Sequence, residues 1–214
     1  MKLTPRHREE LLKVTMSQSS IGETCTGFVW VNPNTKDVIL EDVDVTEFMS
    51  FYPNIIVSLW DEGLIVDPDI KGGVEKLRYF LENRESFEYL SYKTFVNGFY
   101  GFLSMRKGTE VIPRLIDKYL KLVFNEILDK NDKVFYIDTD VIYHIGDLDF
   151  GDLDLSSISS CHVTDVLCIH DKKRYVFYDG IQIGSKGYGK KNRQEAENEF
   201  KKVLRERKLN QLGI

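Results

Sequence analysis

Short apolar segments separated by turn-forming residues predict several β-strands. Residues 27–31 and 38–45 are strand-like and enclose the turn-forming stretch 32–37, so they predict a hairpin with a long loop. Residues 134–137 and 141–145 are apolar runs on either side of an acidic turn, and they predict a second hairpin. Two more strands are expected at 166–169 and 174–178.

Helical spacing dominates much of the remaining chain. Residues 112–128 carry an apolar side chain at every third or fourth position, which marks the buried stripe of an amphipathic helix. Residues 74–102 have similar spacing and predict one or two helices. Further helices are expected at 6–13, from about residue 54, and at 194–209. The glycine-rich, basic segment 184–191 is expected to be a loop, either near DNA or a plain flexible turn. Hairpins with helices between them predict an α+β fold, an antiparallel sheet with helices on one face.

The composition narrows the possible functions. The 214 residues suit one domain, or one domain with a small insert, and can bury a real core. Lys and Arg total 29 while Asp and Glu total 34, which gives a net charge of −5. This charge excludes a protein whose whole surface is basic and binds nucleic acid, so any contact with phosphate must be local. No apolar run approaches the roughly 20 residues of a transmembrane helix, and the N-terminus is no signal peptide. Three cysteines are too few for a disulfide scaffold, so a reducing cytoplasm is expected.

The strongest local signal is the Asp138-Thr139-Asp140 turn between two apolar strands. Two carboxylates this close repel each other unless a cation lies between them. Hard oxygen ligands of this kind suit Mg²⁺, which usually takes one or two protein carboxylates together with substrate phosphates. A solvated turn in which the Asp side chains bond their own backbone is the alternative interpretation.

Two other segments carry weaker signals. On a helix Lys93, Asn97 and Tyr100 share one face, where they could contact a phosphate, a base or a sugar. An ordinary helix with an extended Lys and a half-buried Tyr is the alternative. Residues 47–54 place a carboxylate at a strand end before a turn whose backbone N–H groups can hold phosphate oxygens.

Together, and in this order, the segments resemble the motifs of the family B (alpha-like) DNA polymerases. Motif A of that family reads Asp-x-x-Ser-Leu-Tyr-Pro-Ser, and residues 47–54 read Glu-Phe-Met-Ser-Phe-Tyr-Pro-Asn. Motif B reads Lys-x-x-x-Asn-Ser-x-Tyr-Gly, and residues 93–101 read Lys-Thr-Phe-Val-Asn-Gly-Phe-Tyr-Gly. Motif C reads Tyr-Gly-Asp-Thr-Asp-Ser, and residues 136–141 read Tyr-Ile-Asp-Thr-Asp-Val. The family's Lys-Lys-Arg-Tyr stands intact at 172–175, and Gly27-Phe28 corresponds to its glycine segment.

The resemblance implies a polymerase palm with a short helical fingers insertion: palm at 1–54, reduced fingers at 55–100 and palm again at 101–214. The implied catalytic and metal-binding residues, for Mg²⁺ or Mn²⁺, are Glu47, Asp138, Asp140 and the carbonyl of Phe48. The implied nucleotide-binding residues are Ser50, Phe51, Tyr52 as the steric gate against a ribose 2′-hydroxyl, Lys93, Asn97 and Tyr100. The implied DNA-binding residues are Gly101, Thr139, Lys172, Lys173, Arg174 and Tyr175.

The expected function is therefore that of a template-directed DNA polymerase core, which joins a dNTP to a primer 3′-hydroxyl by two-metal nucleotidyl transfer. We expect primer–template DNA as a partner, other chains that supply an exonuclease and a thumb, and a cytoplasmic location in a bacterial or phage-infected cell. Another possible function is that of a nucleotidyltransferase that extends a protein or a short primer.

Glu47 is a departure from the family pattern, because motif A has Asp at that position. Asp44 could replace it as a ligand, but on a strand Asp44 faces the other side. The alternative function is a catalytically impaired palm that binds DNA or protein. The catalytic interpretation requires Glu47 to lie near Asp138 and Asp140, with no basic side chain of the same chain on their oxygens.

Overall fold

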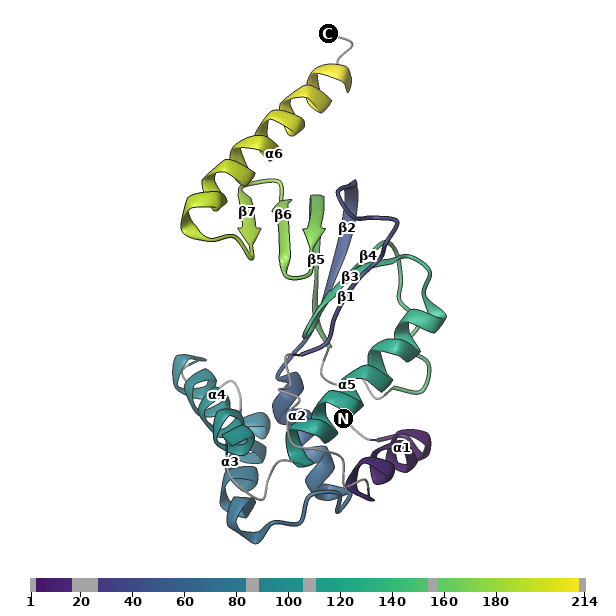
Figure 1. The fold of residues 1–214 in the computed structure, drawn as a ribbon, viewed down its shortest axis with the longest axis vertical. Coiled ribbons are helices and arrows are strands. Elements are labelled where there is room, and N and C mark those ends of the chain that lie inside the picture. Colours follow the sequence, from purple (N-terminus) through teal and green to yellow (C-terminus); the bar gives the residue numbers. More distant parts are fainter. Residues whose placement is uncertain (1–2, 17–26, 84–88, 106–110, 154–157, 212–214) are drawn as a thin grey trace. The chain divides into compact units, whose positions relative to one another are not determined.

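The computed structural model describes residues 3–16, 27–83, 89–105, 111–153 and 158–211. The chain folds into two compact units. One comprises Met1–Phe28, Phe48–Asn131 and Asp149–Ile158, contains helices α1 to α5, and is called the helical unit. The other comprises Val29–Glu47, Asp132–Leu148 and Ser159–Ile214, contains most of the β-sheet and helix α6, and is called the sheet unit. The fold class is α+β, as predicted (Figure 1).

Seven strands form one sheet in the order β1-β3-β4-β2-β5-β6-β7. Each of the pairings β1–β3, β3–β4, β2–β4, β5–β6 and β6–β7 is antiparallel. The strand bounds are β1 Val29–Val31, β2 Ile39–Phe48, β3 Val134–Asp138, β4 Val141–His144, β5 Ile158–Asp171, β6 Arg174–Tyr178 and β7 Ile183–Lys186. The predicted antiparallel sheet is confirmed, and the pairings β3–β4, β5–β6 and β6–β7 join strands that are consecutive in the chain.

The two faces of this sheet are chemically different. Residues paired across antiparallel strands point to the same face, so the register Tyr136↔Tyr143 places these two side chains together. They pack with Tyr175 and three aliphatic residues, Val43, Leu167 and Ile169, on what we call the tyrosine face. On the opposite face, helix α6 (Lys190–Gln211) covers a second cluster made of Cys168, Val176 and Phe200.

The helical unit is built around α5, whose apolar stripe is fully buried. Its helices are α1 Pro5–Met16, α2 Phe51–Asp61, α3 Lys71–Glu82, α4 Tyr89–Met105 and α5 Val111–Lys130, with a short 3₁₀ turn at Pro68–Ile70. Buried residues of α5 recur at three- and four-residue spacing, as predicted for 112–128: Ile112, Leu115, Ile116, Tyr119, Leu120, Val123, Phe124 and Ile127. Helix α1 packs on α5 and α3 packs on α4.

An aromatic cluster anchors the start of α2 within the helical unit. Phe48 stacks on Phe51 with ring centroids 4.6 Å apart. The edge of Phe124 meets both rings, at 5.8 and 5.7 Å, and Phe28 stacks on Phe124 at 5.0 Å. These contacts fix the chain directly after Glu47, the last residue of the first segment of the sheet unit.

Three predictions from the sequence were wrong. Residues 27–31 and 38–45 do not form a hairpin, because β1 pairs with β3 and β2 pairs with β4, so that β3 and β4 lie between β1 and β2 in the sheet. The segment around residues 184–191 was expected to be a loop, yet β7 (Ile183–Lys186) is the edge strand of the sheet. Helix α2 begins at Phe51, three residues before the expected position, because Pro53 lies within its first turn, where a missing N–H costs nothing. In the described helices we find none long and apolar enough to cross a bilayer.

His144 links β2 and β4 as a buried, neutral side chain. Its Nε2 lies 2.8 Å from the hydroxyl of Thr46, and its Nδ1 lies 2.8 Å from the carbonyl oxygen of Gly146. The neutral ring with the proton on Nδ1 satisfies both contacts, since it donates to Gly146 and accepts from Thr46. Burial lowers the pKa of His144, although the Gly146 carbonyl, Asp44 and Asp147 oppose that shift.

A pKa below that of the unfolded chain means that the unfolded state binds the proton more readily. We therefore expect the stability that His144 contributes to be complete above its unfolded pKa near 6.5 and to be lost as the pH falls below that value. Urea unfolding at pH 7.5 and pH 5.5 measures this loss. The difference should be smaller in His144→Gln than in the wild type, and unchanged in the control His170→Asn. An equal loss in His144→Gln would contradict the assignment.

Candidate active site

The Asp138-Thr139-Asp140 segment forms a tight turn that joins β3 to β4. Asp138 ends β3, Val141 begins β4, and the amide of Asp140 donates to the carbonyl of Asp138 at 2.8 Å. Thr139 between them has φ 66°, in the left-handed region that a β-branched residue rarely adopts. Backbone strain of this kind is kept mainly at functional sites, where the surrounding structure holds it in place. We call these three residues the acid turn.

Glu47 lies beside the acid turn because of the strand register. Val141 pairs with Glu47 on one side and with Asp138 on the other, so the Glu47 and Asp138 side chains share the tyrosine face. Asp44 does not belong to this group. It pairs with His144, lies on the opposite face, and accepts a hydrogen bond from the amide of Gly146 at 2.9 Å.

Asp140 is the acid whose ionisation the site perturbs. Burial is the main cause that raises the pKa of Asp140, and the charge of Glu47 raises it further, followed by a smaller effect of Asp138. Lys186 acts in the opposite direction. Glu47 and Asp140 are thus close enough to repel each other, which is the electrostatic condition that a bound cation relieves.

Asp138, in contrast, already has a cation. The condition set by the sequence, that no basic side chain of the same chain lies on these oxygens, therefore fails at Asp138, while among the described residues no salt bridge engages Glu47 or Asp140. Its Oδ2 lies 2.8 Å from the Nζ of Lys186 on β7, and the Asp138 side chain is only 3% exposed. Within the described ranges no group of three or more His, Cys, Asp or Glu side chains is arranged to hold a metal ion. Glu47 and Asp140 are two carboxylates, the number of protein ligands that Mg²⁺ commonly takes.

The acid turn rests on the tyrosine cluster. The rings of Tyr136, Tyr143 and Tyr175 lie 5.4 to 5.7 Å apart, and the hydroxyl of Tyr143 donates to that of Tyr175 at 2.9 Å. Burial raises the pKa of each of the three hydroxyls, so these hydroxyls stay neutral. Contacts between β3 and β6, which are four positions apart in the strand order, show that the sheet curls over this face.

The Lys-Lys-Arg-Tyr segment lies where β5 turns into β6. Lys172, Lys173 and Arg174 are exposed, whereas Tyr175 is buried in the tyrosine cluster. The amide of Lys173 donates to the hydroxyl of Tyr136 at 2.7 Å, which fixes this basic turn to the strand that ends in Asp138. The sheet unit thus carries a local basic turn and the acid turn on one scaffold.

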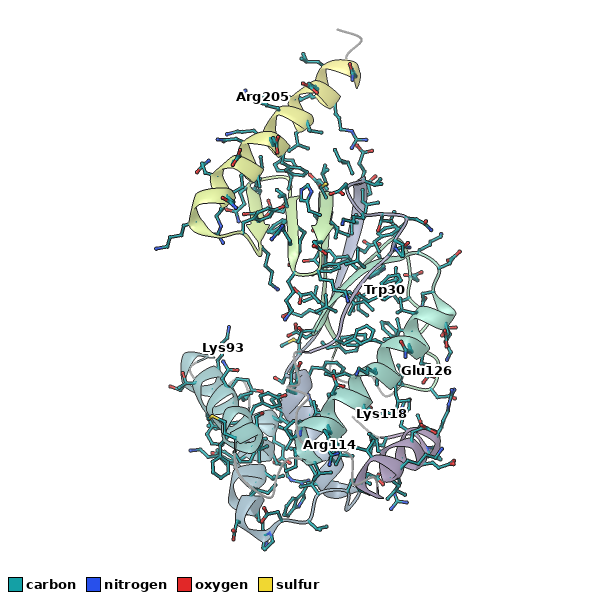
Figure 2. The ribbon with its side chains drawn as sticks, in the orientation of Figure 1. Trp30, Lys93, Arg114, Lys118, Glu126 and Arg205 are labelled. Atoms are coloured by element: carbon teal, nitrogen blue, oxygen red, sulfur yellow. The ribbon has the colours of Figure 1, made fainter. Side chains whose placement is uncertain are left out.

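The remaining predicted residues belong to the helical unit. Ser50 precedes α2 in the left-handed conformation, with φ 51°, and its side chain does not cap the helix. The ring of Tyr52 meets that of Tyr100 edge to face at 5.3 Å, which brings the tyrosines of the two motif-like segments together. Lys93 and Asn97 are exposed on the same helix as Tyr100, α4, and Lys93 projects from it in Figure 2. Phe48 and Phe51 are buried, and Gly101 is half-buried on α4.

The sequence did not identify Lys186 as part of the site. It lies in the segment first interpreted as a loop, and its register with Tyr175 places it on the tyrosine face. Only the curl of the sheet brings it to Asp138. No motif or spacing within the sequence signals that contact.

Comparison with solved structures places the fold among polymerases. The chain is similar to phi29 DNA polymerase in a complex with primer–template DNA, with a TM-score of 0.57 and 12% identity over 91% of this chain and 57% of that one. It is also similar to the family B DNA polymerase of the hyperthermophilic archaeon Pyrobaculum calidifontis, with a TM-score of 0.52 and 18% identity over 86% of this chain and 32% of that one. No protein-family model and no curated protein sequence matches the chain. The fold is therefore polymerase-like, with a palm-like sheet.

Proposed function

We propose that the chain is the core of a template-directed DNA polymerase. The observation that carries this proposal is the register that places Glu47 beside the acid turn, since acids of motifs A and C are then neighbours on a palm-like sheet. The order of the motif-like segments along the chain supports the same conclusion. The reaction is nucleotidyl transfer from a dNTP to a primer 3′-hydroxyl.

In this proposal Glu47 and Asp140 hold a divalent ion, with the carbonyl of Phe48 as a further oxygen ligand. Mg²⁺, or Mn²⁺ in its place, would stabilise the negative charge that develops on the attacking and leaving oxygens. Asp138 assists from the acid turn without being required as a ligand. Burial and the charge of Glu47 raise the pKa of Asp140, and a bound cation would stabilise the charged form of its carboxylate.

The residues that would bind substrate are divided between the two units. In the helical unit we assign the triphosphate to the amides of Ser50 and Phe51 and to Lys93, because N–H groups before a helix and a lysine both favour phosphate. The same unit would use Tyr52 as the steric gate, with Asn97 and Tyr100 beside the nascent base pair. In the sheet unit the primer backbone would contact Lys172, Lys173 and Arg174, with Gly101, Thr139 and Tyr175 supporting the DNA.

The proposed partners are primer–template DNA and dNTP. The chain spans 57% and 32% of the two solved polymerases to which it was compared. We therefore propose that it works with further polymerase or replication components, such as an exonuclease and a thumb, in the cytoplasm of a bacterial or phage-infected cell. Primer extension on a defined template, with an untemplated primer as the control, tests the proposal. Extension that ignores the template would instead indicate a nucleotidyltransferase of another kind.

Replacing Glu47 by Asp should increase primer extension. The substitution shortens the side chain by one methylene and restores the acid of motif A, and misplacement of a catalytic group by about 1 Å can cost ~100-fold in rate. We expect a gain of about tenfold or more in the rate of single-nucleotide addition with Mn²⁺. Asp44→Glu, a change at an acid on the opposite face, is the matched control and should leave the rate unaltered. A decrease in Glu47→Asp would show that the longer side chain is adapted to this site.

A second function is favoured by one observation, the ion pair that engages Asp138. In a catalytically impaired palm that binds DNA or a partner protein, Lys186 would permanently replace the cation and no turnover would occur. Isothermal titration with Mn²⁺ separates the two functions. Neither the wild type nor Glu47→Asp would bind the ion if the palm were only a scaffold, and both would bind it if the polymerase proposal were correct.

A further inference from the structure

Lys186 is built into the tyrosine face rather than loosely placed on the surface. Its partner in the β6–β7 register is Tyr175, and its ammonium group lies 5.9 Å from the centre of that ring. The hydroxyl of Tyr175 is held by that of Tyr143. The next residue, Gly187, has φ 80°, and a Cβ there would collide with the carbonyl oxygen of Lys173. The end of β7 is therefore fixed against the β5–β6 turn.

The two partners of the ion pair differ in exposure. The Asp138 side chain is 3% exposed, whereas that of Lys186 is 54% exposed. A buried carboxylate without a partner is strongly destabilising, so Asp138 depends on Lys186 more than Lys186 depends on Asp138. In the part of the chain that the structure describes, neither Glu47 nor Asp140 forms a salt bridge. Three carboxylates and one ammonium leave a local charge of −2, which matches one divalent cation.

We propose that Lys186 is a positioning residue that sets the divalent-cation affinity of the site. Because Lys186 pairs with the carboxylate of Asp138, that carboxylate does not bind the ion, and Glu47 and Asp140 are the ligands. This inference rests on the proposed function for the presence of the ion. Beyond that function, we infer that Lys186 on β7 offsets part of the negative charge of the acid turn. Lys186 holds the buried carboxylate of Asp138 in an ion pair, and it weakens cation binding by its own positive charge.

The test measures Mn²⁺ affinity by isothermal titration in four variants of the ion pair and one control. Lys186→Met should bind Mn²⁺ about tenfold more tightly than the wild type, and Asp138→Asn about tenfold more weakly, since each changes the local charge by one unit at a partly exposed site. The double variant Asp138→Asn/Lys186→Met restores the local charge, so its affinity should lie within about threefold of the wild type. Lys186→Arg should also keep the wild-type affinity. The control Lys133→Met, which removes a charge directly before β3 and away from the acid turn, should have no effect.

The double variant decides between a counter-ion and a ligand. If Asp138 were a ligand, the double variant would still lack that ligand and would bind Mn²⁺ well below the wild-type affinity, and the proposal would be wrong. An unchanged affinity in Lys186→Met would also overturn it, and so would a wild type that binds no Mn²⁺. Should Lys186→Met fail to fold because Asp138 is left unpaired, the comparison of the double variant with the wild type still gives the answer. Mn²⁺ binding in this pattern without primer extension would reject the polymerase but leave the role of Lys186 standing.

Discussion

Replacing Asp140 by Asn is expected to reduce templated primer extension by about a thousandfold or more. Asp140 is one of the two acids that repel each other at the acid turn, and the charge of Glu47 raises its pKa. An amide keeps the size of the side chain but removes the charge that would hold the divalent ion. A thousandfold loss corresponds to ~4 kcal/mol of transition-state stabilisation, a magnitude that metal-assisted charge stabilisation commonly supplies.

The measurement is single-nucleotide incorporation on a primed template, with Mg²⁺ and with Mn²⁺. Asp132→Asn is the matched control, since Asp132 is an exposed acid of the same unit on a turn before β3. The control should extend primers at the wild-type rate. Activity that persists in purified Asp140→Asn would remove the acid turn from the catalytic site, and the proposal of a polymerase with it.

Local signals in the sequence were sufficient for the hairpin that carries the acid turn. Apolar runs on both sides of Asp-Thr-Asp require two strands and a tight connection, and β3 and β4 lie within one residue of the predicted bounds. The stripe of α5 was equally clear, because a buried helix repeats its apolar positions over five turns. Both elements owe their form to residues close together in the chain.

Strand β7 was missed because its residues have little preference for a strand. Gly184 lacks a side chain, and in the fold the ring of Phe177 covers it, so a Cβ there would collide with that ring. Ser185 faces α6 and donates a hydrogen bond to Glu197. Since β7 is an edge strand with one neighbour, its pairing with β6 supplies what its own composition does not.

The contact between Lys186 and Asp138 belongs to a third class, because it depends on the curvature of the whole sheet. In a flat sheet, strands β3 and β7 would be separated by four others. Neighbouring strands are about 4.8 Å apart, so a lysine could not span that distance. Only tertiary geometry places the ammonium group of Lys186 on Asp138. The Asp-Thr-Asp sequence itself carries no sign of this contact.

The largest effect on stability is expected from Phe124→Ala. Phe124 is fully buried on α5 and contacts Phe28, Phe48 and Phe51. Truncation of a buried Phe removes its transfer free energy and leaves a cavity, at a typical cost of about 3 to 5 kcal/mol. Such a loss is a large part of the 5 to 15 kcal/mol by which domains are usually stable.

Urea unfolding followed by circular dichroism measures this loss, with Asn125→Ala as the matched control on the exposed side of the same helix. The control should change the free energy of unfolding by less than about 0.5 kcal/mol. Because Phe48 directly follows Glu47 in the chain, the cluster around Phe124 also fixes the segment from which the carbonyl ligand would come. Phe124→Leu should recover more than half of the lost stability, since it refills most of the cavity. A loss below about 1 kcal/mol in Phe124→Ala would show that the aromatic cluster is not the core of the helical unit.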